Sequence, residues 1–119
     1  MKIPVFDLKR QYEQLKAELD NAFTNVFESG SFVLGKNVRL FEEEFAEYIG
    51  AGFAVGVGSG TEALHLSLRA YDIGAGDEVI TVPNTAVPTI SAISFTGAKP
   101  VFVDITPDTY TMDLKKVEE

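Results

Sequence analysis

The sequence of 119 residues contains no cysteine and only one histidine, His65. Without cysteine there can be no disulfide framework, no thiolate zinc site and no thiol nucleophile. A single histidine excludes a metal site built from several imidazoles, and no metal site is predicted. No apolar run approaches the ~18 residues of a membrane-spanning helix, and residues 1–7 lack the apolar core of a signal peptide. We therefore expect a cytoplasmic protein without membrane partners.

The charge balance of the chain is acidic. Ten Lys and Arg residues stand against 18 Asp and Glu residues, which gives a formal net charge of −8. Such a chain repels phosphate backbones, so nucleic acid is not expected among its partners. The 45% share of hydrophobic residues is typical of a chain with a packed core.

Two amphipathic helices are predicted near the N-terminus. Apolar residues recur every three or four positions over residues 8–28 and again over residues 38–49, which is the spacing of one helical face. Gly30 and Gly50 are expected to end these helices, because glycine readily adopts the left-handed conformation that follows a helix. The acidic run from Glu42 to Glu44 is interpreted as an exposed helix face.

Residues 51–112 show a different pattern. Short apolar runs typical of buried strands alternate with helical stretches, and turns rich in glycine or proline separate them. The expected strands cover residues 53–57, 78–82 and 100–104, and the expected helices cover residues 61–71 and 86–96. This βαβαβ order predicts right-handed crossovers and a parallel sheet, so the expected fold class is α/β.

A sheet of this size is not expected to form a complete domain. Parallel sheets are normally covered on both faces and are broader than this. We therefore interpret residues 1–119 as the incomplete N-terminal portion of a larger domain. Its expected parts are a helical segment over residues 1–50 and a βαβαβ core over residues 51–112.

A glycine-rich turn, Gly58-Ser59-Gly60, joins the first expected strand to the next helix. Glycine lets the backbone turn tightly and expose N–H groups, and the positive end of the helix dipole favours an anion such as phosphate. Thr61 could cap the helix or offer its hydroxyl or amide to the anion. The Glu62 carboxylate would repel phosphate, so its amide is the expected contact. Alternatively, the glycines only make a tight turn.

Three kinds of phosphate-binding loop compete for this turn. A P-loop needs a lysine after its last glycine, and Thr61-Glu62 supplies none. A dinucleotide-binding loop would place a third glycine at position 61 and an acid at the end of the second strand, where Ile80-Thr81-Val82 offers none. A site for a phosphate-bearing cofactor such as pyridoxal phosphate requires neither that lysine nor that glycine and acid. It is the third hypothesis, and the sequence does not contradict it.

A second polar loop follows the strand expected over residues 78–82. Ligands of parallel sheets bind beyond the carboxyl ends of the strands, so Asn84 and Thr85 are expected beside the glycine-rich turn. Both could hydrogen-bond a ligand, although capping the next helix is the role we favour for Thr85. His65 is interpreted as a packing residue. Asp104, at the end of the third strand, could reach the same crevice or serve in a turn.

Six sequence blocks in a fixed order and spacing carry a family resemblance. The blocks are IPVFDL at 3–8, GSFVLGK at 30–36, FEEEFA at 41–46, GSGTEAL at 58–64, GDEVI at 76–80 and GAKPVFVD at 97–104. Each block alone is weak, but together they resemble the DegT/StrS sugar aminotransferases. Members of that family are fold-type-I pyridoxal phosphate enzymes that act on nucleotide-linked keto sugars.

This resemblance implies where the cofactor would bind. The phosphate of pyridoxal phosphate would be held, chiefly by backbone amides, at Gly60, Thr61 and Glu62. The pyridine ring would lie against Asn84, Thr85 and Ala86. Many relatives carry an aromatic residue in that second loop, so Asn84 is the expected substitute for their stacking contact.

The resemblance also implies a substrate site and partners. The residues expected to approach the sugar are Gly30, Ser31, Phe32 and Val33. The amino donor of the complete enzyme is expected to be glutamate or a similar donor. A homodimer is expected, because the active sites of the family are shared between subunits.

No catalytic residue is assigned within these 119 residues. None of the lysines, at positions 2, 9, 16, 36, 99, 115 and 116, matches the family's Schiff-base position. The acid that pairs with the pyridine nitrogen is also missing. Because covalent catalysis needs that lysine amine, the chain alone is expected to be inactive.

Three other functions remain open at this point. A family member that uses the cofactor for sugar dehydration would carry histidine in place of the missing lysine. A non-catalytic binding or dimerisation module would be folded without any cofactor. An ordinary nucleotide-binding half-domain would bind nucleotide in the absence of pyridoxal phosphate.

Overall fold

The computed structural model describes residues 4–117. Residues 1–3 and 118–119 lie outside the described part, and with them Ile3 of the first family block. The chain divides into an N-terminal unit that ends at Gly56 and a C-terminal unit that begins at Val57. Each unit is described by itself, and the predicted segments 1–50 and 51–112 stay predictions.

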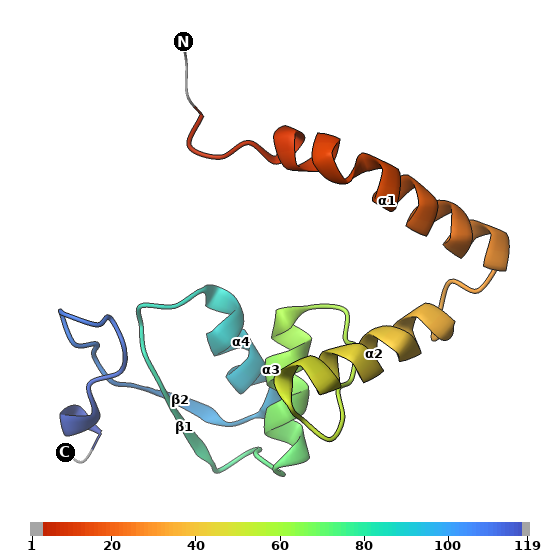
Figure 1. Ribbon diagram of the computed structural model, residues 1–119. Helices are drawn as coiled ribbons and strands as arrows, with labels where there is room; N and C mark the ends of the chain where they lie inside the picture. Colours follow the sequence, from red (N-terminus) through yellow and green to blue (C-terminus); the bar gives the residue numbers. More distant parts are fainter. Residues whose placement is uncertain (1–3, 118–119) are drawn as a thin grey trace. The chain divides into compact units, whose positions relative to one another are not determined.

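The N-terminal unit contains two helices, α1 (Leu8–Ser29) and α2 (Lys36–Ile49) (Figure 1). They end at Gly30 and Gly50, whose φ angles of +62° and +71° lie in the left-handed region that glycine adopts easily. Both predicted helices are confirmed, and so are the glycines that end them.

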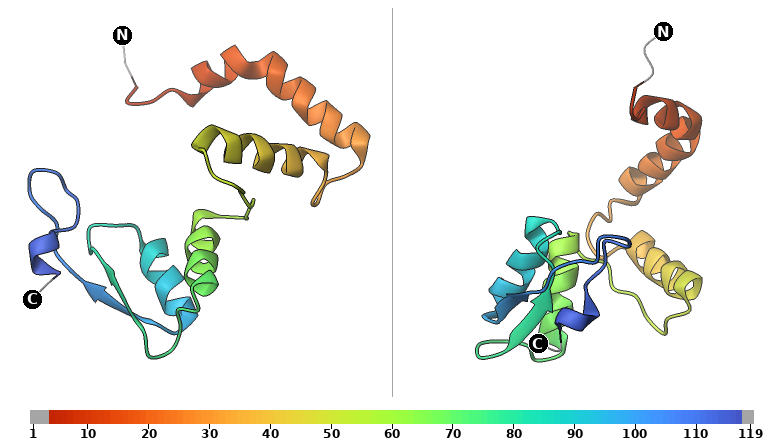
Figure 2. Two further views of the ribbon diagram at one scale, coloured as in Figure 1. Left: turned by 60° about the horizontal axis from the view of Figure 1, so that its bottom comes forward. Right: turned by 90° about the vertical axis from the view of Figure 1, so that its left-hand side faces the viewer.

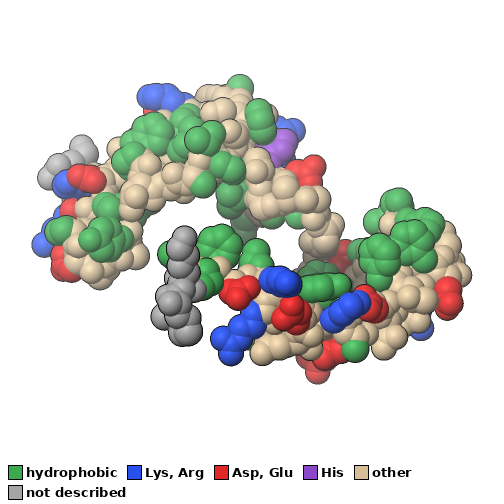
Figure 3. Space-filling view, turned by 90° about the horizontal axis from the view of Figure 1, so that it is seen from above, with side chains coloured by type: hydrophobic (Ala, Val, Ile, Leu, Met, Phe, Trp, Pro, Cys, Tyr) green, Lys and Arg blue, Asp and Glu red, His purple; other side chains and the backbone are tan. Residues whose placement is uncertain are grey.

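The apolar face of α1 is exposed. The ring centroids of Phe23 and Phe27 lie 4.7 Å apart, yet these side chains are 68% and 57% exposed. Hydrophobic side chains also lie open on the surface drawn in Figure 3. A helical stripe of this kind is normally buried against another element. Even so, no helix in residues 4–117 is both long and apolar enough to cross a membrane.

The C-terminal unit combines helices with a two-stranded sheet (Figure 2). Its elements are α3 (Gly60–Ala70), β1 (Glu78–Thr81), α4 (Val87–Thr96), β2 (Lys99–Phe102) and the 3₁₀ helix η1 (Leu114–Lys116). α3 packs against α4, and α4 packs against β2. The strands are parallel and in register from the pair Glu78 and Lys99 to the pair Thr81 and Phe102. The buried apolar residues of this unit are Ala92, Ile93, Ala98 and Val103.

The predicted α/β class and its parallel strands are thus observed, but the first predicted strand is wrong. Residues 53–57 form no strand, and Phe53 and Val55 are 91% and 78% exposed rather than buried. A strand exists only where its backbone groups pair with a neighbouring strand. Here the N–H of Gly56 donates instead to the side chain of Glu42, at 2.7 Å.

Candidate functional site

The predicted phosphate site lies at the start of α3. Ser59 is the N-cap, and its Oγ accepts a hydrogen bond from the N–H of Glu62 at 3.2 Å. The prediction that Thr61 caps this helix is wrong, because α3 already begins at Gly60. Ser59 and Glu62 have the spacing of a capping box, and this signal could have identified the cap from the sequence.

Two amides at this helix start are free to bind a ligand. The N–H groups of Gly60 and Thr61 belong to the first turn, where no carbonyl precedes them in the helix, and no residue in 4–117 accepts a hydrogen bond from either. The third predicted contact, the amide of Glu62, is already engaged by Ser59. Gly60 is exposed and Thr61 is half-buried, so an anion can reach the free amides.

The Glu62 carboxylate folds back over the turn. A Cβ atom placed on Gly58 would stand 2.7 Å from Glu62 Oε2, which shows how near the carboxylate lies to the backbone of the turn. A carboxylate near a helix N-terminus is stabilised by the helix dipole. Since like charges repel, a phosphate bound here would displace this exposed side chain.

The loop after β1 lies at the same end of the C-terminal unit as the start of α3. In Figures 1 and 2 the N-terminal ends of α3 and α4 both lie at this end. The N-cap of α4 is Ala86, which has no side-chain cap, and the Oγ1 of Thr85 lies 2.9 Å from the Oγ1 of Thr89. The predicted capping role of Thr85 is therefore wrong, because its hydroxyl pairs with another hydroxyl. Asn84, Thr85 and Ala86 are all exposed.

His65 and Asp104 both have structural partners. His65 is half-buried and meets the ring of Phe95 edge-on, with ring centroids 6.1 Å apart. One carboxylate oxygen of Asp104 accepts a hydrogen bond from the N–H of Ile105 at 2.8 Å. The other accepts a hydrogen bond from Nζ of Lys116 at 3.3 Å. The Ile105 hydrogen bond and then the Lys116 ammonium lower the pKa of Asp104. Asp104 thus serves the loop that leads to η1.

The residues predicted to approach a sugar form the loop between α1 and α2 in the N-terminal unit. The N–H of Ser31 donates to the Oγ of Ser29 at 3.1 Å. The ring of Phe32 packs edge-on against Phe27, with centroids 5.5 Å apart, while Val33 is 80% exposed. Local contacts therefore shape this loop and leave apolar groups on its surface, and its role in sugar binding stays a prediction.

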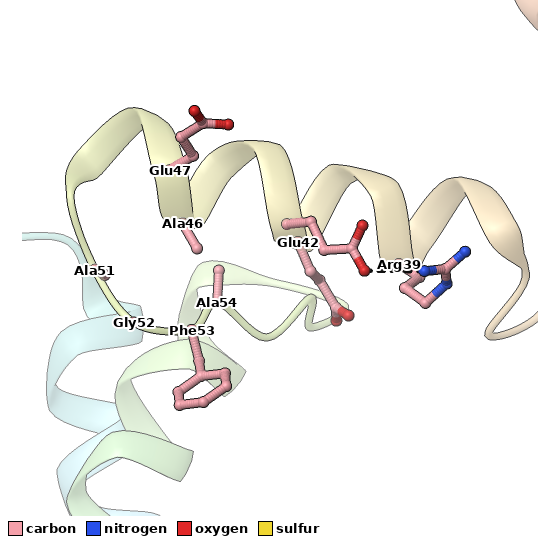
Figure 4. Close-up of a pocket in the computed structure, with 9 residues that line it drawn as sticks. Arg39, Glu42, Ala46, Glu47, Ala51, Gly52, Phe53 and Ala54 are labelled. Atoms are coloured by element: carbon pink, nitrogen blue, oxygen red, sulfur yellow. Dashed lines mark hydrogen bonds and ion pairs between the residues drawn. The ribbon is translucent and has the colours of Figure 1, made fainter.

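Surface hollows occur in both units, away from the predicted site residues. In the C-terminal unit, a mainly apolar hollow of about 290 Å³ lies between α3, β1 and α4. In the N-terminal unit, a hollow of about 500 Å³ lies between α2 and residues 51–54 (Figure 4). Neither hollow is lined by a residue predicted to bind cofactor or sugar. The described part of the chain holds no group of three His, Asp or Glu side chains that could bind a metal ion.

Solved structures define the class of protein. The chain superposes on DesV of S. venezuelae, solved in complex with a ketimine intermediate, with a TM-score of 0.93 and 46% identity over 98% of this chain and 32% of that chain. It superposes equally on NtdA from Bacillus subtilis with bound cofactor PMP, with a TM-score of 0.92 and 30% identity over 98% of this chain and 27% of that chain. The fold is that of the fold-type-I aminotransferases, as predicted.

The family follows from the sequence comparison. The model of the DegT/DnrJ/EryC1/StrS aminotransferase family matches residues 13–119, and the chain belongs to this family. A dTDP-3-amino-3,4,6-trideoxy-alpha-D-glucose transaminase from Micromonospora megalomicea subsp. nigra is 47% identical over 91% of this chain. The chain covers only 29% of that relative. The resemblance seen in the six sequence blocks is therefore confirmed.

Proposed function

We propose that this chain is the N-terminal part of a pyridoxal phosphate-dependent aminotransferase that acts on nucleotide-linked keto sugars. Its family membership supports this proposal, as does its identity of 47% with a transaminase named for a dTDP-linked sugar. The bound PMP of NtdA supports the cofactor class. The observation that carries the proposal is the pair of amides, those of Gly60 and Thr61 at the start of α3, that have no hydrogen-bond acceptor within residues 4–117.

The cofactor phosphate is assigned to Gly60, Thr61 and Glu62. The free amides of the first two would donate to phosphate oxygens, and the helix dipole adds about half a positive charge at the same point. Glu62 would contribute through the backbone of the first turn, which Ser59 caps. The residues present therefore fit a phosphate group.

The pyridine ring is assigned to Asn84, Thr85 and Ala86. These residues are exposed at the same end of the C-terminal unit as the phosphate site (Figure 1). They are small, so they leave space for a flat ring, and the amide of Asn84 can lie against it. When bound, pyridoxal phosphate supplies the electron sink for amino transfer, and these residues would orient it.

The complete enzyme would also need a Schiff-base lysine and an acid that pairs with the pyridine nitrogen, and neither is assigned to a residue of this chain. No lysine here matches the family's Schiff-base position, so we propose that the chain alone is inactive. The loop of Gly30, Ser31, Phe32 and Val33 is proposed to contact the sugar. Glutamate or a similar amino donor, a homodimer and a cytoplasmic location complete the proposal.

The test begins with the reading frame that encodes this chain. The frame is followed past Glu119, the complete protein is purified, and absorbance of bound pyridoxal phosphate is recorded. Formation of 2-oxoglutarate from glutamate is then measured with dTDP-linked and UDP-linked keto sugars. We expect bound cofactor and sugar-dependent 2-oxoglutarate. A stop codon after Glu119, a complete protein that binds no cofactor, or sugar dehydration without amino transfer would contradict the proposal.

A further inference from the structure

Glu42 differs from the other carboxylates of its acidic run. Glu43 and Glu44 are exposed, whereas Glu42 is half-buried. Arg39, one turn earlier in α2, pairs with Glu43 at 3.0 Å. The Glu42 carboxylate instead accepts the backbone N–H of Gly56 at 2.7 Å, fourteen residues further along the chain. The interpretation of the whole run as an exposed face is therefore incomplete.

Gly56 lies in ordinary contact with side chains of α2. A Cβ atom at this position would lie 3.4 Å from Glu42 Oε1 and 3.7 Å from Val38 Cγ1. A hydrogen bond from a backbone amide to a carboxylate is charge-assisted and is stronger than a bond between neutral groups. Glu42 therefore holds the backbone of Gly56 against the helix.

A second hydrogen bond attaches the other end of the same segment. The N–H of Ala51 donates to the carbonyl oxygen of Ala46 at 2.9 Å, and Ala46 is buried. Between these two points, Ala46 and Ala54 face each other across the hollow, and the ring of Phe53 points away from α2 (Figure 4). Since residues 53–57 have no strand partner within residues 4–117, the attachment to α2 is what fixes the segment.

We propose that Glu42 is a positioning residue for the cofactor-binding turn. It fixes the backbone at Gly56, which precedes Gly58 of the turn by two residues, and so limits the conformations open to the amides of Gly60 and Thr61. This proposal rests on the proposed function, because it takes those amides as the phosphate site. The proposed role acts through the backbone of Gly56 and needs no contact of Glu42 with cofactor or substrate.

The test compares three variants of the complete protein. Glu42→Ala removes the acceptor, Glu42→Gln keeps an amide oxygen that can accept the same N–H, and Glu44→Ala removes an exposed carboxylate of the same run. The dissociation constant of pyridoxal phosphate is measured by absorbance titration of the cofactor-free protein. Circular dichroism reports whether each variant folds, and hydrogen exchange of the Gly56 amide in the full chain reports the hydrogen bond itself.

We expect Glu42→Ala to weaken cofactor binding about tenfold, in line with the loss of one charge-assisted hydrogen bond, and to speed exchange at Gly56. Glu42→Gln should recover most of the affinity, and Glu44→Ala should match the wild type. Equal cofactor affinity in Glu42→Ala and wild type would overturn the positioning role. Equal losses in the Ala and Gln variants would do the same. If the wild type itself binds no pyridoxal phosphate, the proposed function fails, and the exchange data still show whether Glu42 holds Gly56.

Discussion

Ser59 determines where α3 begins. Its hydroxyl satisfies the amide of Glu62, one of the N–H groups that a helix start leaves without a partner. As a result the helix starts early enough to leave the amides of Gly60 and Thr61 facing outward. The cap and the candidate phosphate site therefore depend on the same residue.

Replacing Ser59 with Ala is expected to destabilise the chain by about 1 kcal/mol, the usual cost of losing an N-cap side chain. Urea unfolding of the full chain, followed by circular dichroism, measures this cost. Ser67→Ala is the matched control, since the Oγ of Ser67 donates to the carbonyl of Ala63 within the same helix and caps no helix end. The control should be neutral, because alanine is the better helix former. A similar cost for both variants would contradict the capping role.

Asp104 should contribute a pH-dependent term to stability. The hydrogen bond from Ile105 and the ammonium of Lys116 lower its pKa in the folded chain below the ordinary value of 3.8. A lowered folded pKa means that this contribution is present above pH 3.8 and is lost as the pH falls through the folded value. Carboxyl carbon NMR should find the lowered pKa. In the Lys116→Met variant the pKa of Asp104 should rise only part of the way to its ordinary value, because the hydrogen bond from Ile105 is the larger cause of the lowering. A full return to the ordinary value would contradict this ranking.

At the scale of the elements, local signals were enough for α1 and α2. The spacing of apolar residues gave their faces, and Gly30 and Gly50 gave their ends, because both signals act within a few residues. The strand predicted over 53–57 failed because pairing depends on a distant partner, which the local pattern cannot supply. The starts of α3 and α4 were each missed by one residue, since Ser59 rather than Thr61 caps α3 and no side chain caps α4.

Gly50 and Gly52 offer a matched pair for testing helix ends. Gly50 has φ of +71°, whereas Gly52 has no such angle, and a Cβ atom would meet nothing within 4 Å at either position. Gly50→Ala should therefore cost about 1 kcal/mol through backbone strain alone. Gly52→Ala should be neutral or slightly stabilising. Urea unfolding of the full chain compares the two, and equal effects would show that the left-handed angle does not end α2.

At the scale of the whole molecule, the sequence identified the family and the α/β class, and both are confirmed. The blocks that carry the resemblance are spread over the chain, which is why they identified a family better than any single motif. The cofactor and sugar contacts remain predictions, because they depend on ligands and on regions that these residues do not include. The hydrogen bond between Gly56 and Glu42 was not predicted, because the two residues are fourteen positions apart and only the folded chain brings them together.

The exposed apolar surface predicts how the chain behaves alone. Large side chains such as Phe23, Phe53 and Phe95 are more than half exposed, and few apolar residues are buried. Patches of this kind bind hydrophobic dyes. The full chain should therefore enhance the fluorescence of anilinonaphthalene sulfonate far more strongly, residue for residue, than the complete protein. A monomer without dye binding would favour an autonomous module instead.

The central claim is that the start of α3 holds the cofactor phosphate through free backbone amides. Gly60→Pro tests it most directly, since proline is well tolerated at the first position of a helix and lacks only the N–H. The extended backbone of Ser59, with ψ of 162°, also suits a following proline. Gly60→Ala keeps the N–H and is the control. The measurement is the dissociation constant of pyridoxal phosphate for both variants of the complete protein, at equal helix content. The account predicts that Gly60→Pro binds about tenfold more weakly than Gly60→Ala, and equal binding would contradict it.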